Sequence, residues 1–309
     1  MSNSALHVIF GTGPLGKWTA RELVKMGKQV RLVNRSGQAM DLPPGAEMIK
    51  ADAYDVANNI AITKNAAAIY QCAQPAYYEW PQKFPAFQEA ILQAAIANGA
   101  KFIAAENLYV YGDTHGQPMT EDTPYAAHTR KGKTRQAMTE ALFAAHKAGK
   151  VRAASARGSD FFGPDDSVSS GMLYKPALQG KTVNAMGRLD MPHTFTYAPD
   201  FGKTLAILGT RDEALGKAWH VPSTAAITQK EYQNLIAQEI GKPIKAMAMS
   251  APMLKFFGIF NKLAAEMPEM LYEFTQPFVM DSSRFTNMFD LRPTPLNEAI
   301  RETVAWNKK

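Results

Sequence analysis

The glycines at positions 11, 13 and 16 constrain the fold of this chain more than any other feature. The motif Gly11-Thr12-Gly13-Pro14-Leu15-Gly16 follows an apolar run at residues 5–10 and opens a stretch of helical spacing at 15–26. In a strand–turn–helix unit, the first glycine permits a tight turn, the second lets a pyrophosphate approach the backbone, and the third permits close helix–strand packing. The helix N-terminus then offers unpaired N–H groups to phosphates. This context predicts dinucleotide binding; the alternative is a glycine-rich turn that only connects the two elements.

The first half of the chain alternates short apolar runs with longer segments of helical periodicity. Further strands are predicted at residues 29–33, 47–50, 66–73, 101–105 and 151–156, and helices at residues 55–64, 82–98 and 134–148. Strands that alternate with helices form right-handed βαβ units, which close into a parallel sheet covered on both faces. We therefore predict an α/β fold with a Rossmann-like, doubly wound parallel sheet.

The alternation breaks after about residue 158. Helices are predicted at 167–179, 200–208 and 228–240, a strand at 218–221, and a mostly helical tail follows. We expect residues 1–165, with returning segments at about 186–228, to form the cofactor domain, and 166–185 with 229–309 to form a smaller, mostly helical lobe. Seven of the 16 methionines fall between Met247 and Met288. They indicate either an adaptable pocket or interface, or plain helical core.

Composition excludes several classes of protein. The chain has 309 residues and a single cysteine, Cys72, which rules out an intramolecular disulfide and favours a reducing cytoplasm. No apolar stretch approaches the roughly 20 residues that span a bilayer, and the start lacks the basic region of a signal peptide. The net charge of +6 is diffuse, with its densest cluster at 130–135. We expect a cytoplasmic monomer or homodimer that binds neither nucleic acid nor membrane.

The residues after the second predicted strand bear on the choice of cofactor. NAD-binding proteins usually carry Asp or Glu there to bind the ribose hydroxyls. This chain has Asn34-Arg35-Ser36 instead. Neutral Asn34 does not repel a 2′-phosphate, Arg35 offers it a planar fork of donors, and Ser36 adds a hydroxyl. The sequence favours NADP over NAD, although Arg35 could also be an ordinary surface arginine.

Two further strand ends are expected at the same edge of the sheet. Asp52 and Ala53 follow the third strand, where Asp52 could accept the adenine amino group. Ala73 and Gln74 follow the fourth strand beside the expected ribose. Open α/β sheets bind their ligands at the carboxyl ends of their strands, so these positions complete the predicted cofactor contacts.

In several segments, the chain resembles the short-chain dehydrogenase/reductase superfamily, and within it the extended branch, the NAD-dependent epimerase/dehydratase family. The segments that carry the resemblance are GTGPLG, NRS, ADA, CAQPAY, KFIAAENLYVYG leading to EDTP, RGSDFFGP and TFTYAPD. The resemblance implies a Rossmann-like sheet, a nicotinamide cofactor and a smaller C-terminal substrate lobe.

The catalytic residues of that family do not match. The family uses a Ser or Thr and a Tyr-x-x-x-Lys pair, whose lysine lowers the pKa of the tyrosine. No tyrosine of this chain has lysine four positions on; the serine position falls on Asn107, the tyrosine on Gly132 and the lysine on Gln136. The chain is therefore similar to atypical members of the superfamily that have a degraded tetrad.

Three residues are the candidates for catalysis. Asn107 could donate a hydrogen bond to a substrate carbonyl, or simply satisfy local backbone. Tyr109 follows at strand-like spacing with Tyr111, and could be a pocket acid, while Tyr111 is expected to be structural. Lys133 lies near the missing tyrosine. His193 is more typical of a local hydrogen-bonding residue, and the spacing of the six histidines predicts no metal site.

The sequence supports two functions. The first is an NADP(H)-dependent oxidoreductase or epimerase/dehydratase-like enzyme of atypical chemistry, acting on a small carbonyl or hydroxyl substrate. The second is a non-catalytic NADP(H)-binding regulator or sensor whose C-terminal lobe meets a partner. The loss of the Tyr-x-x-x-Lys pair favours the second, and a polar pocket beyond the nicotinamide would favour the first.

Overall fold

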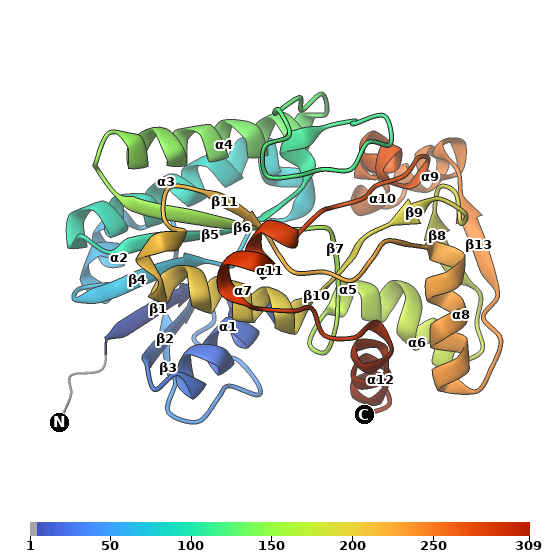
Figure 1. Cartoon of the computed structure of the whole chain (residues 1–309), viewed down its shortest axis with the longest axis horizontal. Helices are drawn as coiled ribbons and strands as arrows, with labels where there is room; N and C mark the ends of the chain where they lie inside the picture. Colours follow the sequence, from blue (N-terminus) through green and yellow to red (C-terminus); the bar gives the residue numbers. More distant parts are fainter. Residues whose placement is uncertain (1–4) are drawn as a thin grey trace.

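The computed structural model describes residues 5–309, with a seven-stranded parallel sheet at its centre (Figure 1). The strand order is β11-β6-β5-β4-β1-β2-β3, and every neighbouring pair is parallel. The strands are β1 (Leu6–Phe10), β2 (Gln29–Asn34), β3 (Glu47–Lys50), β4 (Ala66–Gln71), β5 (Lys101–Asn107), β6 (Arg152–Gly158) and β11 (Ala218–His220). Because the chain crosses from β1 to both sides, the predicted doubly wound Rossmann-like sheet is confirmed.

Helices cover both faces of this sheet. Side chains of α3 (Trp80–Asn98) and α4 (Arg130–Lys147) share one apolar core, beside α2 (Val56–Ile62), while α1 (Pro14–Lys25) and α7 (Ala198–Thr210) share the other. In α3, Phe84, Ile91 and Leu92 are buried, and the helix ends at Gly99 in the left-handed conformation. The amphipathic spacing therefore predicted this helix and its end correctly.

The C-terminal part is largely helical, as predicted. Its helices are α5 (Ser167–Ser169), a π-helical turn (Ser170–Tyr174), α6 (Lys175–Leu178), α8 (Gln229–Ile240), α9 (Ala251–Gly258), α10 (Lys262–Glu266), a 3₁₀ segment (Pro268–Phe274), α11 (Ser283–Phe289) and α12 (Leu296–Asn307). In α8, Thr228 and Glu231 form a reciprocal capping box.

Short two-stranded sheets lie outside the central sheet, and the sequence did not reveal them. They are β7 (Asp160–Phe162) with β10 (Phe195–Tyr197), β9 (Pro192–His193) with β12 (Ile227–Thr228), and β8 (Val183–Met186) with β13 (Ala246–Met249). Two residues of the methionine-rich stretch, Met247 and Met249, therefore lie in a strand and not in a helix. Met249, Met267 and Met270 are buried or packed at the base of this lobe.

One local prediction is wrong. Tyr109 and Tyr111 were expected at strand-like spacing, but β5 ends at Asn107 and residues 109–111 form a 3₁₀ turn. The Asn107 side chain accepts the backbone N–H of Tyr109 at 3.3 Å, and Gly112 follows at a φ of 65°. This local hydrogen bond and the left-handed glycine turn the chain away from the sheet. The two tyrosines therefore point to different surroundings.

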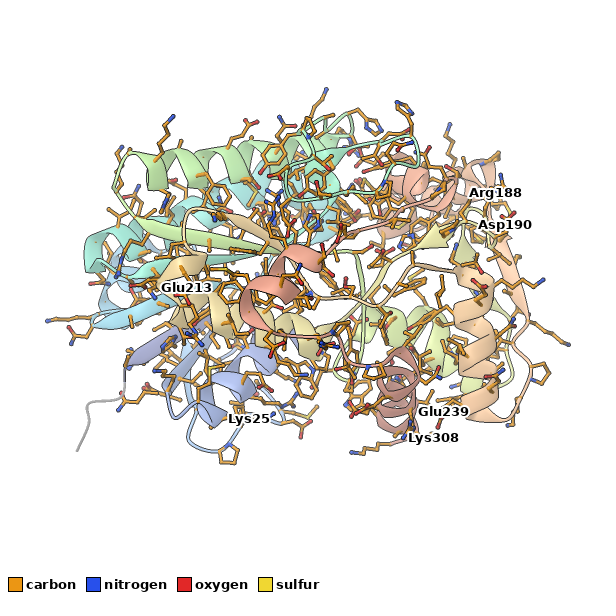
Figure 2. All side chains as sticks on the ribbon, viewed as in Figure 1. Lys25, Arg188, Asp190, Glu213, Glu239 and Lys308 are labelled. Atoms are coloured by element: carbon orange, nitrogen blue, oxygen red, sulfur yellow. The ribbon has the colours of Figure 1, made fainter. Side chains whose placement is uncertain are left out.

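Charged side chains are spread over the surface of both parts of the molecule, as Figure 2 shows. Within residues 5–309, no helix has both the length and the apolar character needed to cross a bilayer. In the same part of the chain, no three His, Cys, Asp or Glu side chains are grouped as they would be around a metal ion.

Candidate functional site

The three glycines of the motif differ in what surrounds them. At Gly11, with a φ of 121°, a Cβ would lie 2.8 Å from the backbone of Cys72 and Ala73. At Gly16, a Cβ would lie 2.0 Å from the carbonyl oxygen of Gly11. At Gly13, by contrast, no heavy atom of the described residues beyond its chain neighbours lies within 4 Å of a Cβ position. Two glycines are therefore required by close packing, and the third faces open space.

That open space lies at the N-terminus of α1. Gly13 is the N-cap, Pro14 occupies the first turn, and no side chain of the described residues caps the helix. The first N–H groups of α1 are therefore available to an anion, and the positive end of the helix favours one. The arrangement fits a pyrophosphate approaching the backbone at Gly13. Thr12 is hydrogen-bonded to the end of β2: its hydroxyl oxygen accepts a hydrogen bond from Nδ2 of Asn34 at 2.8 Å.

The segment after β2 is a tight loop built around Asn34. Nδ2 of Asn34 also donates to the carbonyl of Gln38 at 2.8 Å, and Oδ1 accepts the N–H of Gly37 at 2.7 Å. The hydroxyl of Ser36 donates to the same Oδ1 at 3.1 Å. Asn34 therefore shapes the loop, while Arg35 is exposed and close enough to Tyr54 to act on it electrostatically. Of the three predicted residues, Arg35 is the one that carries a charge, and its side chain is exposed.

The other predicted cofactor residues lie at the same edge of the sheet. Asp52 is exposed and its carboxylate accepts the N–H of Tyr54 at 3.1 Å, while Ala53 is buried. Ala73 packs against Gly11, and Gln74 is exposed. The structure thus brings the ends of β1, β2, β3 and β4 together around the glycine motif. Burial raises the pKa of the neighbouring Cys72 thiol to about 12, so the lone cysteine is a poor nucleophile.

Gly132 and Gln136, the positions to which the sequence analysis assigned the family's tyrosine and lysine, both lie on α4. At Gly132, a Cβ would lie 2.9 Å from the carbonyl oxygen of Tyr109 and 2.9 Å from Oγ1 of Thr129. A tyrosine could enter here only if the backbone at Tyr109 moved. Gln136 binds the N–H of Ala127 and the carboxylate of Glu140, at 3.3 and 2.8 Å. Neither position supplies an acid or a base.

The two lysines beside Gly132 lie in opposite environments. Lys133 is exposed on α4, and Lys131 is completely buried. The ammonium of Lys131 pairs with Glu266 and Glu269 and lies 4.4 Å from the ring centre of Tyr77. Lys131, which the sequence did not single out, therefore holds α10 and the following 3₁₀ segment against the start of α4.

The predicted residues Asn107 and Tyr109 lie at the end of β5. Asn107 uses its oxygen locally, on the N–H of Tyr109. The Tyr109 hydroxyl lies 3.0 Å from that of Tyr77, which follows β4. Burial, together with the charges of Glu273 and Asp160, raises the pKa of Tyr109 well above its usual range. Tyr109 is therefore a neutral hydrogen-bonding group and, unlike the family's tyrosine, is not activated by a lysine.

Three further polar residues converge on this place, and the sequence did not group them. Asp160 follows β6, His193 lies in β9, and Glu273 lies in the last 3₁₀ segment. Nε2 of His193 lies 2.8 Å from Oδ2 of Asp160, and Nδ1 lies 3.2 Å from the carbonyl oxygen of Glu273. We call Tyr77, Tyr109, Asp160, His193 and Glu273 the cleft cluster. Since β4, β5 and β6 are neighbours, their carboxyl ends bring its first three members together.

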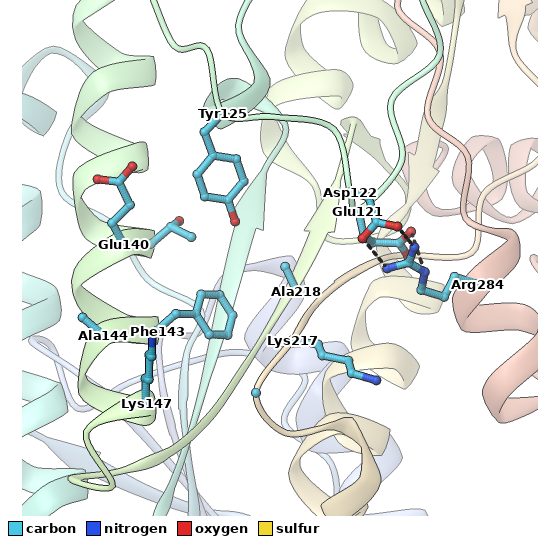
Figure 3. Close-up of a pocket in the computed structure, with 12 residues that line it drawn as sticks. Glu121, Asp122, Tyr125, Glu140, Phe143, Ala144, Lys147, Lys217, Ala218 and Arg284 are labelled. Atoms are coloured by element: carbon cyan, nitrogen blue, oxygen red, sulfur yellow. Dashed lines mark hydrogen bonds and ion pairs between the residues drawn. The ribbon is translucent and has the colours of Figure 1, made fainter.

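A groove of about 470 Å³ lies elsewhere, between α4 and the edge strand β11 (Figure 3). It is lined by Tyr125, Phe143, Lys147 and Lys217, and Arg284 closes one side through its ion pair with Asp122. None of its lining residues belongs to the glycine motif or to the cleft cluster. Below it, Arg157 and Glu106 form a buried ion pair at 3.0 Å. We therefore place the candidate site at the carboxyl edge of the sheet and not in this groove.

Known structures share the fold over nearly the whole chain. A putative epimerase from Burkholderia cenocepacia is 18% identical, with a TM-score of 0.79 and 99% of both chains covered. UDP-glucose 4-epimerase from Thermotoga maritima is 16% identical, with a TM-score of 0.80 and 98% of both chains covered. dTDP-glucose 4,6-dehydratase from Streptomyces venezuelae, solved with NAD bound, is 15% identical, with a TM-score of 0.78 and coverage of 98% and 97%. No curated protein sequence matches the chain significantly.

The sequence itself matches a known family over most of its length. The profile of the NAD dependent epimerase/dehydratase family aligns with residues 8–221, from β1 to the residue after β11. This span contains the glycine motif and four of the five residues of the cleft cluster. It also contains the seven strands of the central sheet, except for the first two residues of β1. The predicted resemblance is confirmed: the chain belongs to the NAD dependent epimerase/dehydratase family.

Proposed function

We propose that the chain is an NADP(H)-dependent oxidoreductase or epimerase/dehydratase-like enzyme that acts on a small carbonyl or hydroxyl substrate without a Tyr-x-x-x-Lys pair. The observation that carries the proposal is the glycine motif, where Gly11 and Gly16 are packed tightly and Gly13 faces open space at the start of α1. Structures of the same fold that carry NAD support a nicotinamide cofactor. When bound, that cofactor would supply or accept hydride at a substrate carbon.

The cofactor contacts in this proposal are those at the sheet edge. The backbone from Gly11 to Gly16 would bind the pyrophosphate, and the exposed Arg35 would bind the 2′-phosphate that distinguishes NADP. Asn34 and Ser36 would hold the Arg35 loop, and Asp52, Ala53, Ala73 and Gln74 would line the adenine and ribose positions. Since structures of the same fold carry NAD, a comparison of NADPH with NADH binding tests the choice of NADP directly.

In the substrate region, we propose that Asn107 and Tyr109 contact the substrate oxygen as hydrogen-bonding groups. A neutral tyrosine paired with a second tyrosine hydroxyl can donate a hydrogen bond but is a weak acid. Lys133, the third candidate, is exposed on α4, so it would contact a substrate only from the solvent side.

The cofactor domain would comprise residues 1–165 with returning segments at about 186–228, which contain α7 and β11. Residues 166–185 and 229–309 would form the substrate lobe, and the protein would be a cytoplasmic monomer or homodimer.

A titration tests the cofactor and a screen tests the activity. NADPH fluorescence should show saturable binding to the wild-type protein and none to Gly13→Asp, whose carboxylate would occupy the phosphate position. A panel of small aldehydes and ketones, followed by NADPH absorbance, should then yield a substrate. If the wild-type protein binds neither NADPH nor NADH, the proposal is wrong.

A second function is favoured by one observation. The tip of α9 and the loop after it expose Phe256, Ile259 and Phe260 to solvent, as a protein-binding surface would. A regulator that binds NADP(H) and a protein partner would show saturable NADPH binding and no turnover of any carbonyl in the panel. The convergence of five polar side chains in the cleft cluster supports the enzyme instead, because a regulator does not need them.

A further inference from the structure

The hairpin formed by α9 and α10 carries large apolar side chains that face solvent. Phe260 is 80% exposed and Ile259 is 72% exposed, and Phe256, Leu263 and Phe257 follow at 61%, 48% and 43%. We call these five residues, which all lie between positions 256 and 263, the apolar tip. Single exposed apolar residues are common on protein surfaces, but a contiguous group marks a site of contact with a partner or with lipid.

The hairpin that carries the apolar tip is itself well packed. Leu254 of α9 is buried in a small apolar core of the C-terminal part. Gly258 lets the two helices approach closely, since a Cβ there would lie 2.8 Å from Cα of Ala265. The side-chain oxygen of Asn261 caps α10, because it accepts two N–H groups of the first turn at 2.9 and 3.2 Å. The tip is therefore a fixed surface feature and not a loosely packed piece of core.

The hairpin is also attached to the part of the molecule that holds the central sheet. Glu266, at the end of α10, pairs with Arg130 and Lys131 of α4. Nζ of Lys262 lies 5.3 Å from the ring centre of Tyr78, in the short turn after β4. A surface that binds the apolar tip therefore orients the whole molecule.

The charge around the apolar tip is positive. From position 240 to position 265, the chain contains four lysines and no aspartate, glutamate or arginine. All four are exposed: Lys242, Lys245, Lys255 and Lys262. The segments that carry them lie together, since Figure 1 shows β13, α9 and α10 at one end of the long axis of the molecule. Exposed lysines beside aromatic and aliphatic side chains are typical of elements that bind the surface of an anionic bilayer.

A second copy of this chain fits the apolar tip less well. In a twofold interface the same surface meets itself, so the lysines beside the tip of one copy would face the lysines of the other. Like charges placed opposite one another weaken such a contact, whereas anionic headgroups attract all four lysines. Charge complementarity therefore favours a lipid surface.

We propose that the apolar tip binds this protein to the surface of a bilayer that carries anionic lipid headgroups. Phe256, Ile259 and Phe260 enter the boundary between headgroups and acyl chains, and Lys255 and Lys262 pair with the headgroups. The tip lies in this interface and does not cross the bilayer. The proposal departs from the expectation, drawn from the lack of a spanning stretch, that the chain binds no membrane. It does not depend on the proposed function.

Sedimentation with lipid vesicles tests the binding. The full chain should sediment with vesicles that contain phosphatidylglycerol, much less with vesicles of phosphatidylcholine alone, and less in high salt. The double variant Ile259→Ser, Phe260→Ser should bind the anionic vesicles on the order of 100-fold more weakly, because two apolar side chains no longer enter the interface. The double variant Lys255→Gln, Lys262→Gln should bind on the order of 10-fold more weakly. All four side chains are exposed, so both variants should unfold at the same urea concentration as the wild type.

Matched controls remove the same chemistry elsewhere on the surface. Val168→Ser removes an apolar side chain that is 61% exposed on α5. The double variant Lys25→Gln, Lys308→Gln removes two surface lysines that lie away from the hairpin (Figure 2). Both controls should bind anionic vesicles as the wild type does.

A fluorescence measurement distinguishes insertion into lipid from contact with a protein. In Phe260→Trp, the emission added to that of the wild type should shift to the blue with anionic vesicles and be quenched by brominated lipid. Val168→Trp should show neither change. A tip that binds only protein would leave the emission of both variants unchanged, and the inference would then be wrong.

Two further outcomes would also overturn the inference. One is a wild-type protein that does not sediment with anionic vesicles. The other is equal binding by the wild type and the variant Ile259→Ser, Phe260→Ser. If the wild type fails to bind vesicles and is a dimer that this variant converts to a monomer, the tip is an interface between two copies. None of these measurements uses NADPH, so their failure would leave the proposed function standing.

Discussion

The cofactor edge and the cleft cluster differ in how their residues are brought together. The cofactor edge depends on six consecutive residues, Gly11 to Gly16, and on the ends of the next three strands along the chain. The cleft cluster takes its members from segments as far apart as Tyr77 and Glu273, and two of them sit on short elements that only long-range pairing creates. A local motif fixes the first region, and the tertiary structure alone fixes the second.

The two regions also differ in their electrostatics. The cofactor edge exposes the positive charge of Arg35 and the positive end of a helix, together with the carboxylate of Asp52. The cleft cluster gathers carboxyl groups and neutral phenols in a largely buried space, with the nearest ammonium already paired. The first arrangement suits an anion, and the second concentrates groups that can form hydrogen bonds. The predictions below probe this division.

The largest effect is expected at the packed glycine of the cofactor edge. Gly16→Ala should lower the free energy of unfolding by about 3 kcal/mol or more. The new Cβ would lie 2.0 Å from the carbonyl oxygen of Gly11, and a backbone atom cannot move aside as a flexible side chain can. Gly13→Ala is the matched control: no atom of residues 5–309 beyond its chain neighbours lies within 4 Å of its Cβ position, so its stability should stay within about 0.5 kcal/mol of wild type. Urea denaturation measures both. NADPH binding should fall in both variants; unchanged binding by Gly13→Ala would show that the open space is not the phosphate site.

The next largest effect is the acid sensitivity of the sheet. Burial, with smaller effects from Lys28 and Lys101, lowers the pKa of His7 to about 4 from 6.5. Between pH 6.5 and 4, the unfolded chain therefore binds a proton at His7 that the folded chain does not bind. The free energy of unfolding has its full value above pH 6.5 and decreases as the pH falls towards 4. The loss should reach about 2–3 kcal/mol at the low end. His7→Gln should flatten this dependence in urea denaturation series; an equally steep loss in the variant would assign it to another group, such as His220, whose pKa burial lowers to about 3.

The same comparison explains how much the sequence could predict. The sheet, α3 and the glycine motif depend on periodicity and on neighbours within a few residues, so they could be inferred directly. Asp160 and His193 could not be paired, because their contact depends on β7 pairing with β10 and on β9 pairing with β12. Their elements are two or three residues long, too short to show a period.

The two lysines on α4 show the same limit of prediction from the sequence. Lys131 and Lys133 look equivalent in the sequence, since both flank the missing tyrosine. Burial of Lys131 depends on Glu266 and Glu269, more than 130 residues further on, which no local pattern reveals. Asn34 is the converse case: its position at the end of the second strand was predicted, but its hydrogen bonds within the loop were not.

A smaller effect is expected from Arg35, which we propose selects NADP over NAD. Arg35→Ala should weaken NADPH binding about tenfold, or roughly 1.4 kcal/mol, through the loss of a charge-assisted contact with the 2′-phosphate. NADH binding should not change. Arg188→Ala removes a surface arginine paired with Asp190 and is the control for a general loss of positive charge (Figure 2). Equal affinity of the wild-type protein for NADH and NADPH, unaffected by Arg35→Ala, would mean that the cofactor is not selected at this loop.

The smallest effect, and one of opposite sign to that of His7, is expected in the cleft cluster. Burial, with the charge of Asp160, raises the pKa of Glu273 well above 4.5, so the folded chain keeps a proton that the unfolded chain releases. By linkage, this group destabilises the fold as the pH rises above 4.5. Glu273→Gln keeps the shape without the ionisable proton, and should be more stable than wild type at neutral pH by about 1 kcal/mol, with the difference shrinking towards pH 4.5. Urea denaturation at the two pH values measures it. A variant less stable than wild type at neutral pH would mean that Glu273 is ionised in the fold.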